Sequence, residues 1–137
     1  MNVKTAYVAG AFRAPTYEER QRNLMRAITV AVWGWDYGYA VICPHLNGGA
    51  LCDYVKEDTV LMPGHVALAM AANMLILVPG WQESGGATVE FVAWCRSHSE
   101  DPIERNEAFY YDFFEARMRA EHLPDISNPF LPSDLAR

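Results

Sequence analysis

The sequence predicts an α/β domain with a doubly wound parallel sheet of four to five strands and an extra C-terminal helix. Short apolar runs bounded by Gly or Pro alternate along the chain with longer segments of helical periodicity. The 137 residues, 51% of them hydrophobic, suffice for one compact core. We therefore expect a single domain, 1–137, with its core at about 4–98 and its C-terminal helix and tail at about 104–137.

The first half of the pattern predicts two buried strands around one helix. An apolar run at 5–10 ends in glycine, and a second run at 39–43 is stopped by Pro44. Between them, Thr16 and Glu19 form a Ser/Thr-x-x-Glu capping box, so a helix should begin there and end at Gly38. The segment 45–63 is expected to be a long loop.

The second half predicts a further helix and strand followed by a less regular end. We expect a helix at 64–72, a strand at 73–79, a loop at 80–86 and a helix at 87–98. Pro102 and Ile103 suggest a short fourth strand, and 107–122 should form a helix with Phe109 and Phe113 on one face. The last 15 residues are expected to be a tail.

Charge and composition exclude several classes of function. A net charge of -6 argues against a general nucleic-acid surface, so an anionic ligand must be held locally. The longest apolar stretches are interrupted, which argues against a membrane span. Cys43, Cys52 and Cys95 form no C-x-x-C pair and are expected to be reduced packing thiols of a cytoplasmic protein. Neither a Walker loop, nor a G-x-G-x-x-G fingerprint, nor metal-ligand spacing is present, so no metal and no cofactor are expected.

Ligands bind parallel sheets at the carboxyl ends of the strands, where the strand order reverses. For strand order 2-1-3, the loops 10–13 and 80–86 flank that crevice. Ser84, Gly85 and Gly86 stand just before a helix, where bared backbone N–H groups can bind a phosphate. The alternative is a glycine-rich connector.

Two residues are candidates for catalysis. Glu90 is expected in the first turn of the helix at 87–98, where its carboxylate can attack an anomeric carbon. Tyr7, inside the first strand, can hydrogen-bond that carboxylate and fix its orientation. The alternatives are a charge that complements the helix terminus and a half-buried strand aromatic.

Three further residues lie in the loops of the same edge. His45 and Asn47 follow the second strand, and His45 is a candidate proton donor because its ordinary pKa is near neutral. Arg13, three residues after Gly10, is a candidate for pairing with a phosphate. Gly10 and Asn47 are further candidates for contacts with the substrate or its phosphate. A structural histidine and a solvated arginine are the alternatives.

These motifs together resemble the nucleoside 2-deoxyribosyltransferase superfamily, which includes nucleoside 5′-monophosphate N-glycosidases. The resemblance spans Tyr7 to Cys95 and rests on YVAGAFR, VICPHLN and LVPGWQESGGATVEF. It implies a flavodoxin-like fold, a homodimer or higher homo-oligomer, Glu90 as the nucleophile and Tyr7 as its support. In this family, transferases of free nucleosides place an aspartate at the position of Ser84, whereas the monophosphate hydrolases place a serine there. The resemblance therefore implies a nucleoside monophosphate, or a nucleoside, as the ligand.

The chain departs from the family pattern at two positions. Val66 and Asn73 stand where relatives usually carry aspartates, the first of which helps to protonate the leaving base. His45, His65 and Asp53 are the remaining candidates for that proton donor. One alternative is a nucleotide-binding or sensor module of the same fold without catalysis. Another is a phosphoribohydrolase-type enzyme or an interaction protein that uses its C-terminal aromatic helix.

Overall fold

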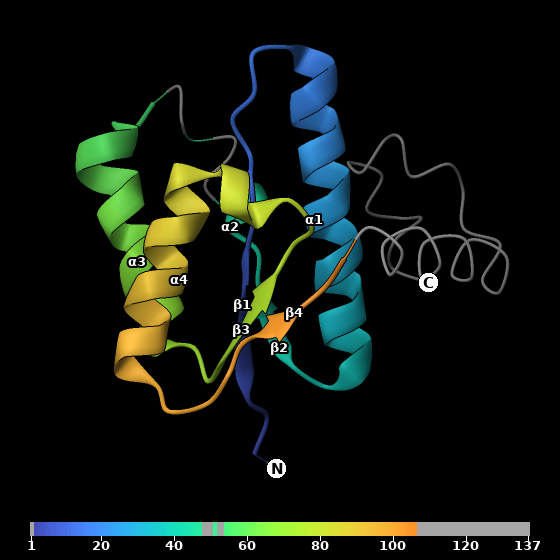
Figure 1. The fold of residues 1–137 in the computed structure, drawn as a ribbon, viewed down its shortest axis with the longest axis vertical. Helices are drawn as coiled ribbons and strands as arrows, with labels where there is room; N and C mark the ends of the chain where they lie inside the picture. The colour runs from blue at the N-terminus through green and yellow to red at the C-terminus, as the bar shows by residue number, and fades with distance from the viewer. Residues whose placement is uncertain (1, 48–50, 52–53, 107–137) are drawn as a thin grey trace, which may run out of the picture.

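In the computed structural model, the described residues, 2–47, 51 and 54–106, contain a four-stranded sheet of order β2-β1-β3-β4 in which every pair is parallel (Figure 1). The strands are β1 (Thr5–Ala9), β2 (Ala40–Ile42), β3 (Met74–Leu77) and β4 (Ile103–Glu104). The α/β class, the parallel sheet and the short fourth strand are therefore confirmed. The expected helix at 107–122 and the tail lie outside the described residues.

The helix between β1 and β2 has the two ends that its sequence predicts. Helix α1 spans Tyr17–Tyr37. The Thr16 hydroxyl accepts a hydrogen bond from the Glu19 N–H at 3.1 Å, as an N-cap does. At the other end, Gly38 adopts φ 109°, a left-handed conformation that glycine enters without a steric penalty.

The sheet is covered on both faces, with α1 on one side and α3 (Met62–Ala71) and α4 (Gly85–Ser97) on the other (Figure 1). Side chains alternate along β1 because a strand has a period of two. Ala6 and Val8 are in the core beside α1, whereas Tyr7 and Ala9 are in the core beside α3 and α4. This alternation points Tyr7 toward α4.

The strand order reverses between β1 and β3, so both strands end beside the same edge. The β1–α1 loop and the β3–α4 turn leave from that edge, which lies at the top of Figure 1. The segments that follow β1 and β3 approach each other closely there: a Cβ added to Gly10 would lie 2.6 Å from the Val78 Cβ. A glycine is therefore required where β1 passes β3.

Two segments differ from the prediction. The expected loop at 45–63 contains a short helix α2 (Pro44–Asn47) and a π-helical turn η2 (Glu57–Leu61) that leads into α3. Helix α4 starts at Gly85 rather than 87, after a 3-10 turn η3 (Trp81–Glu83), because Ser84 caps it. The Ser84 cap and the packing of α4 on the sheet outweigh the low helix propensity of the two glycines in the first turn. None of the helices within the described ranges has the length and apolarity that a bilayer crossing requires.

Candidate active site

Glu90 lies on the face of α4 that packs against the sheet. Since α4 begins at Gly85, Glu90 is in its second turn, and the expectation of a first-turn position was wrong. Its side chain is buried, with an exposed fraction of 4%. A second-turn carboxylate is one turn away from the unpaired amides of the helix start, so it does not act merely as a charge at the helix terminus.

Tyr7 donates its phenolic hydrogen to the Glu90 Oε2. Tyr7 is in the middle of β1, paired with Ile42 on one side and Leu75 on the other, and is fully buried. The sheet fixes its backbone on both sides, which leaves the hydroxyl little freedom. The tyrosine therefore holds the carboxylate in one orientation.

Burial sets the protonation of this pair. Loss of solvent raises the pKa of Glu90 to about 7, and the hydrogen bond from Tyr7 partly opposes that rise. Burial, followed by the charge of Glu90, also raises the pKa of the Tyr7 phenol, so Tyr7 stays protonated and remains a donor. At neutral pH the carboxyl is thus close to half ionised and can serve either as a nucleophile or as an acid.

The turn before α4 leaves two backbone N–H groups unused. Ser84 accepts from the Ala87 N–H through its Oγ at 3.1 Å, and its own N–H donates to the Trp81 carbonyl at 3.0 Å. In the described part of the chain, the N–H groups of Gly85 and Gly86 meet no acceptor. Two free donors at a helix N-terminus are suited to an anion.

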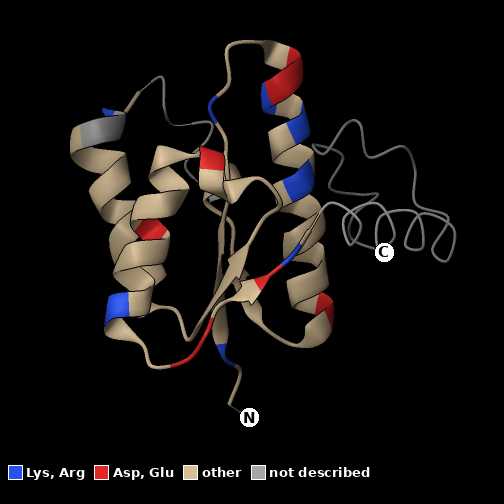
Figure 2. Ribbon diagram, in the orientation of Figure 1, with Lys and Arg blue, Asp and Glu red and all other residues tan. Residues whose placement is uncertain are grey.

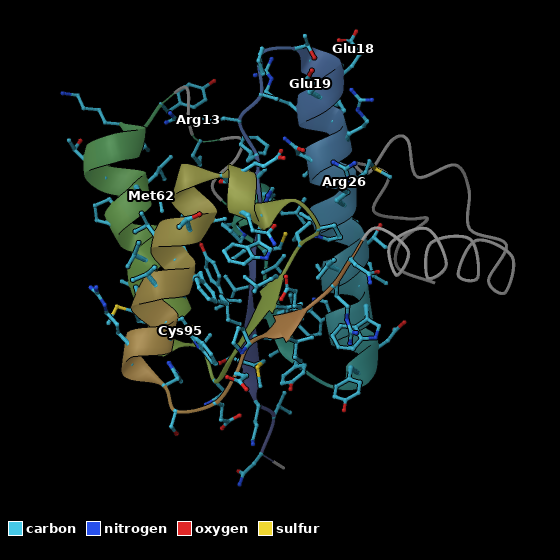
Figure 3. The ribbon with its side chains drawn as sticks, viewed as in Figure 1. Arg13, Glu18, Glu19, Arg26, Met62 and Cys95 are labelled. Carbon is cyan, nitrogen blue, oxygen red and sulfur yellow. The ribbon has the colours of Figure 1, made fainter. Side chains whose placement is uncertain are left out.

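Arg13 and Met62 lie at the same end of the molecule as this turn (Figure 3). Arg13 is exposed on the β1–α1 loop, and further basic residues occupy the first half of α1 (Figure 2). Met62, at the start of α3, packs beside Gly86: a Cβ added to Gly86 would be 3.4 Å from the Met62 Sδ. Positive charge, free amides and an apolar side chain therefore share the carboxyl edge of the sheet.

The contacts of His45 indicate a structural role. It is buried, and its Nε2 lies 2.9 Å from the Ala11 carbonyl oxygen, so Nε2 carries the hydrogen and donates it. Its Nδ1 faces the Cys43 Sγ at 3.9 Å, and the Phe12 ring meets the imidazole edge-on at 5.7 Å. Burial lowers the pKa of His45 to about 4. These contacts favour the role of a neutral clamp on the β1–α1 loop over that of a proton donor.

The remaining candidate residues are Asp53, Asn47 and His65. Asp53 lies outside the described residues, and Asn47 ends α2 without a described side chain. His65 follows Met62 by one turn of α3 and is half-buried, and its electrostatic interaction with His45 is a minor contribution to the low pKa of His45. Within the described ranges, His65 is thus the candidate acid that remains near this edge.

Asn73 has a role at the opposite edge of the sheet. Its Oδ1 accepts from the Thr5 N–H at 2.9 Å, and its own N–H donates to the Thr5 Oγ1 at 3.1 Å. These bonds join the starts of β1 and β3. Asn73 therefore lies away from the carboxyl edge of the sheet.

The sequence did not reveal three residues around the turn. These residues are Trp81, Gln82 and Glu104. The side chains of Trp81 and Gln82 each donate a hydrogen bond to the Glu104 carboxylate. Glu104 reaches this turn because β4 pairs with β3 in the sheet. A local sequence motif could not predict this contact. No group of three or more His, Cys, Asp or Glu residues in the described part of the chain is arranged to hold a metal ion.

Comparison of the chain with protein-family models, with curated proteins and with solved structures gives no match.

Proposed function

We propose that this protein cleaves the N-glycosidic bond of a nucleoside 5′-monophosphate, with Glu90 as the nucleophile and with the flavodoxin-like fold of the nucleoside 2-deoxyribosyltransferase superfamily. The observation that carries the proposal is the buried Glu90 carboxyl, hydrogen-bonded by Tyr7, on a helix that starts with two free amides. A structural glutamate would be expected at the surface or in an ion pair.

The chemistry follows from the pair. The ionised Glu90 oxygen attacks C1′, a C–O bond forms, and the C1′–N bond breaks as its electron pair leaves with the base. The base takes a proton from an acid, for which His65 is the candidate. Water then attacks C1′ and releases the Glu90 carboxylate, and the proton of the water passes to the side chain that protonated the leaving nucleobase, which restores the enzyme. The products of hydrolysis are the free base and the sugar phosphate. A second nucleobase in place of water gives transfer.

Phosphate recognition is assigned to the turn and the facing loop. The Gly85 and Gly86 N–H groups donate to the phosphate, with Arg13 adding positive charge and the Ser84 hydroxyl a further donor. A serine brings no negative charge to this place, unlike the aspartate of transferases that act on free nucleosides. The close approach at Gly10 keeps the β1–α1 loop next to the turn.

The test is release of free base. The protein is incubated with each ribonucleoside and deoxyribonucleoside 5′-monophosphate, and the products are separated by chromatography. We expect release from at least one substrate, and loss of release in Glu90→Ala and Glu90→Gln. Glu100→Gln, which removes an exposed carboxylate, is the matched control and should retain activity. Equal release by wild type and Glu90→Ala would reject the proposal.

A nucleotide-binding or sensor module is the second candidate. The observation that favours it is the state of His45, which is neutral and already donates its Nε2 hydrogen to Ala11. Binding of a nucleoside monophosphate in calorimetry, with no base released over a long incubation, would select this function over catalysis.

A further inference from the structure

Glu104 joins the sheet to the turn that precedes α4. It ends β4 and is paired with Leu77 of β3. The N–H of the following residue, Arg105, donates to the Leu77 carbonyl at 3.2 Å. Its Oε1 accepts two hydrogen bonds from the turn: from the Trp81 Nε1 at 3.3 Å and from the Gln82 Nε2 at 3.4 Å. One carboxylate oxygen thus holds the side chains of Trp81 and Gln82, the first two residues of η3.

Trp81 passes this restraint on to α4. Its ring packs against Phe91 of α4, with centroids 4.6 Å apart and planes inclined by 41°. Its N–H donates to the Val78 carbonyl at 3.1 Å, and its carbonyl accepts from the Ser84 N–H at 3.0 Å. A shift of Trp81 therefore moves the residue that caps α4.

A restraint of this kind matters because the turn is short. Helix η3 has three residues, follows Gly80, which is in a left-handed conformation, and has no side-chain N-cap bond. Short 3-10 turns have few and poorly aligned internal hydrogen bonds, so contacts to the rest of the protein fix their orientation. Glu104 supplies such contacts from a rigid strand.

We propose that Glu104 is a positioning residue, which orients the Gly85 and Gly86 amides for phosphate through Trp81. This inference rests on the proposed function and deepens it. Glu104 acts through the turn that it contacts, and it is assigned no contact with the substrate. Its negative charge opposes an anion nearby, so the benefit must come from the geometry that it imposes on the turn.

The test separates geometry from charge with two substitutions. Glu104→Gln keeps an acceptor oxygen and removes the charge, whereas Glu104→Ala removes both. Trp81→Phe keeps the ring against Phe91 and removes the indole donor. Each variant is titrated with inorganic phosphate while the Gly85 and Gly86 amide resonances are followed by nuclear magnetic resonance. Glu100→Ala, an exposed acid in the loop before β4, is the matched control.

We expect phosphate binding to weaken roughly threefold to tenfold in Glu104→Ala and Trp81→Phe, the size of a lost partly exposed hydrogen bond to a charged group. Glu104→Gln should restore at least wild-type binding. In turnover of a nucleoside monophosphate, the loss should appear in KM with little change in kcat, because Tyr7 holds Glu90 independently.

Three results would overturn the inference. Unchanged phosphate affinity in Glu104→Ala would reject the positioning role of Glu104 and leave the proposed function intact. Equal losses in kcat and in KM would mark a general structural role instead. If phosphate does not shift the wild-type amides, the phosphate site of the proposed function is wrong, and the positioning role goes with it. Thermal melts show which variants remain folded.

Discussion

Replacing Glu90 by Gln should stabilise the protein at alkaline pH. Glutamine has nearly the shape of a protonated glutamic acid and keeps an oxygen that can accept from Tyr7. Burial raises the pKa of Glu90 from 4.5 to about 7, so the folded protein holds a proton that the unfolded chain releases. The contribution of Glu90 to the free energy of unfolding therefore falls as the pH rises from about 4.5 to about 7, and it is level above that range.

The size of this effect follows from the shift. At 1.36 kcal/mol per pKa unit, the move from 4.5 to about 7 corresponds to about 3 kcal/mol at pH 8. Glu90→Gln removes this cost, which amounts to a rise in Tm of roughly 10 °C for a domain of this size. At pH 4, where the carboxyl is protonated in both states, the two proteins should be equally stable.

His45 would hide this effect in the wild type. Its pKa falls from 6.5 to about 4, so the unfolded chain takes up a proton that the folded protein refuses, and stability is lost as the pH falls from about 6.5 to about 4. The contributions of Glu90 and His45 to the free energy of unfolding change in opposite directions over most of this pH range. The stability of the wild type should thus depend little on pH there, whereas Glu90→Gln should become more stable as the pH rises from about 4 to about 6.5.

Urea unfolding at half-unit steps from pH 4 to 8.5 measures the difference between the two proteins. The exposed-site control Glu100→Gln should differ from wild type by no more than about 0.5 kcal/mol at every pH. A constant difference between Glu90→Gln and wild type across the range would refute the reasoning, because it would mean that Glu90 is ionised alike in both states.

Three further outcomes follow from the same contacts. The kcat/KM for base release should fall below pH 7 and be about 100-fold lower at pH 5, because the nucleophile must be ionised; a flat profile would exclude that role. Tyr7→Phe removes the hydrogen bond that lowers the pKa of Glu90, so the midpoint of the pH–rate profile should move upward, and chemical unfolding should show a loss of about 1–3 kcal/mol. Gly10→Ala should destabilise the fold by about 1–3 kcal/mol through its clash with Val78. Gly64→Ala, on an open site of α3, should be neutral or stabilising by up to about 1 kcal/mol, and equal melting temperatures of the two variants would contradict the clash.

The fold was predictable where local chemistry is strong. Thr16 and Gly38 each specify a helix end through one side chain or one backbone conformation, and both ends are where the sequence puts them. The start of α4 was misplaced because two glycines resemble a loop. Their low helix propensity is outweighed by the Ser84 cap and by the packing of the helix on the sheet, neither of which a local pattern measures.

The candidate site was partly predictable for the same reason. Strand periodicity and helix position bring Tyr7 and Glu90 to one face, and the structure joins them. His45 is a candidate proton donor by sequence, but its ring is turned to the Ala11 carbonyl and Cys43. A sequence shows that a histidine is present at an edge, whereas its protonation depends on which nitrogen meets which partner.

Burial links the proposed chemistry of this site to its cost in stability. If Glu90 were on the solvent side of α4, its carboxyl would be fully ionised at neutral pH and hydrated, and it would cost the fold nothing. In the core beside Tyr7 it is only half ionised, poorly solvated and fixed, which makes the ionised fraction a stronger nucleophile and the fold less stable. A variant in which Glu90 is stabilised by a new positive partner should therefore gain stability above pH 7 and lose turnover together.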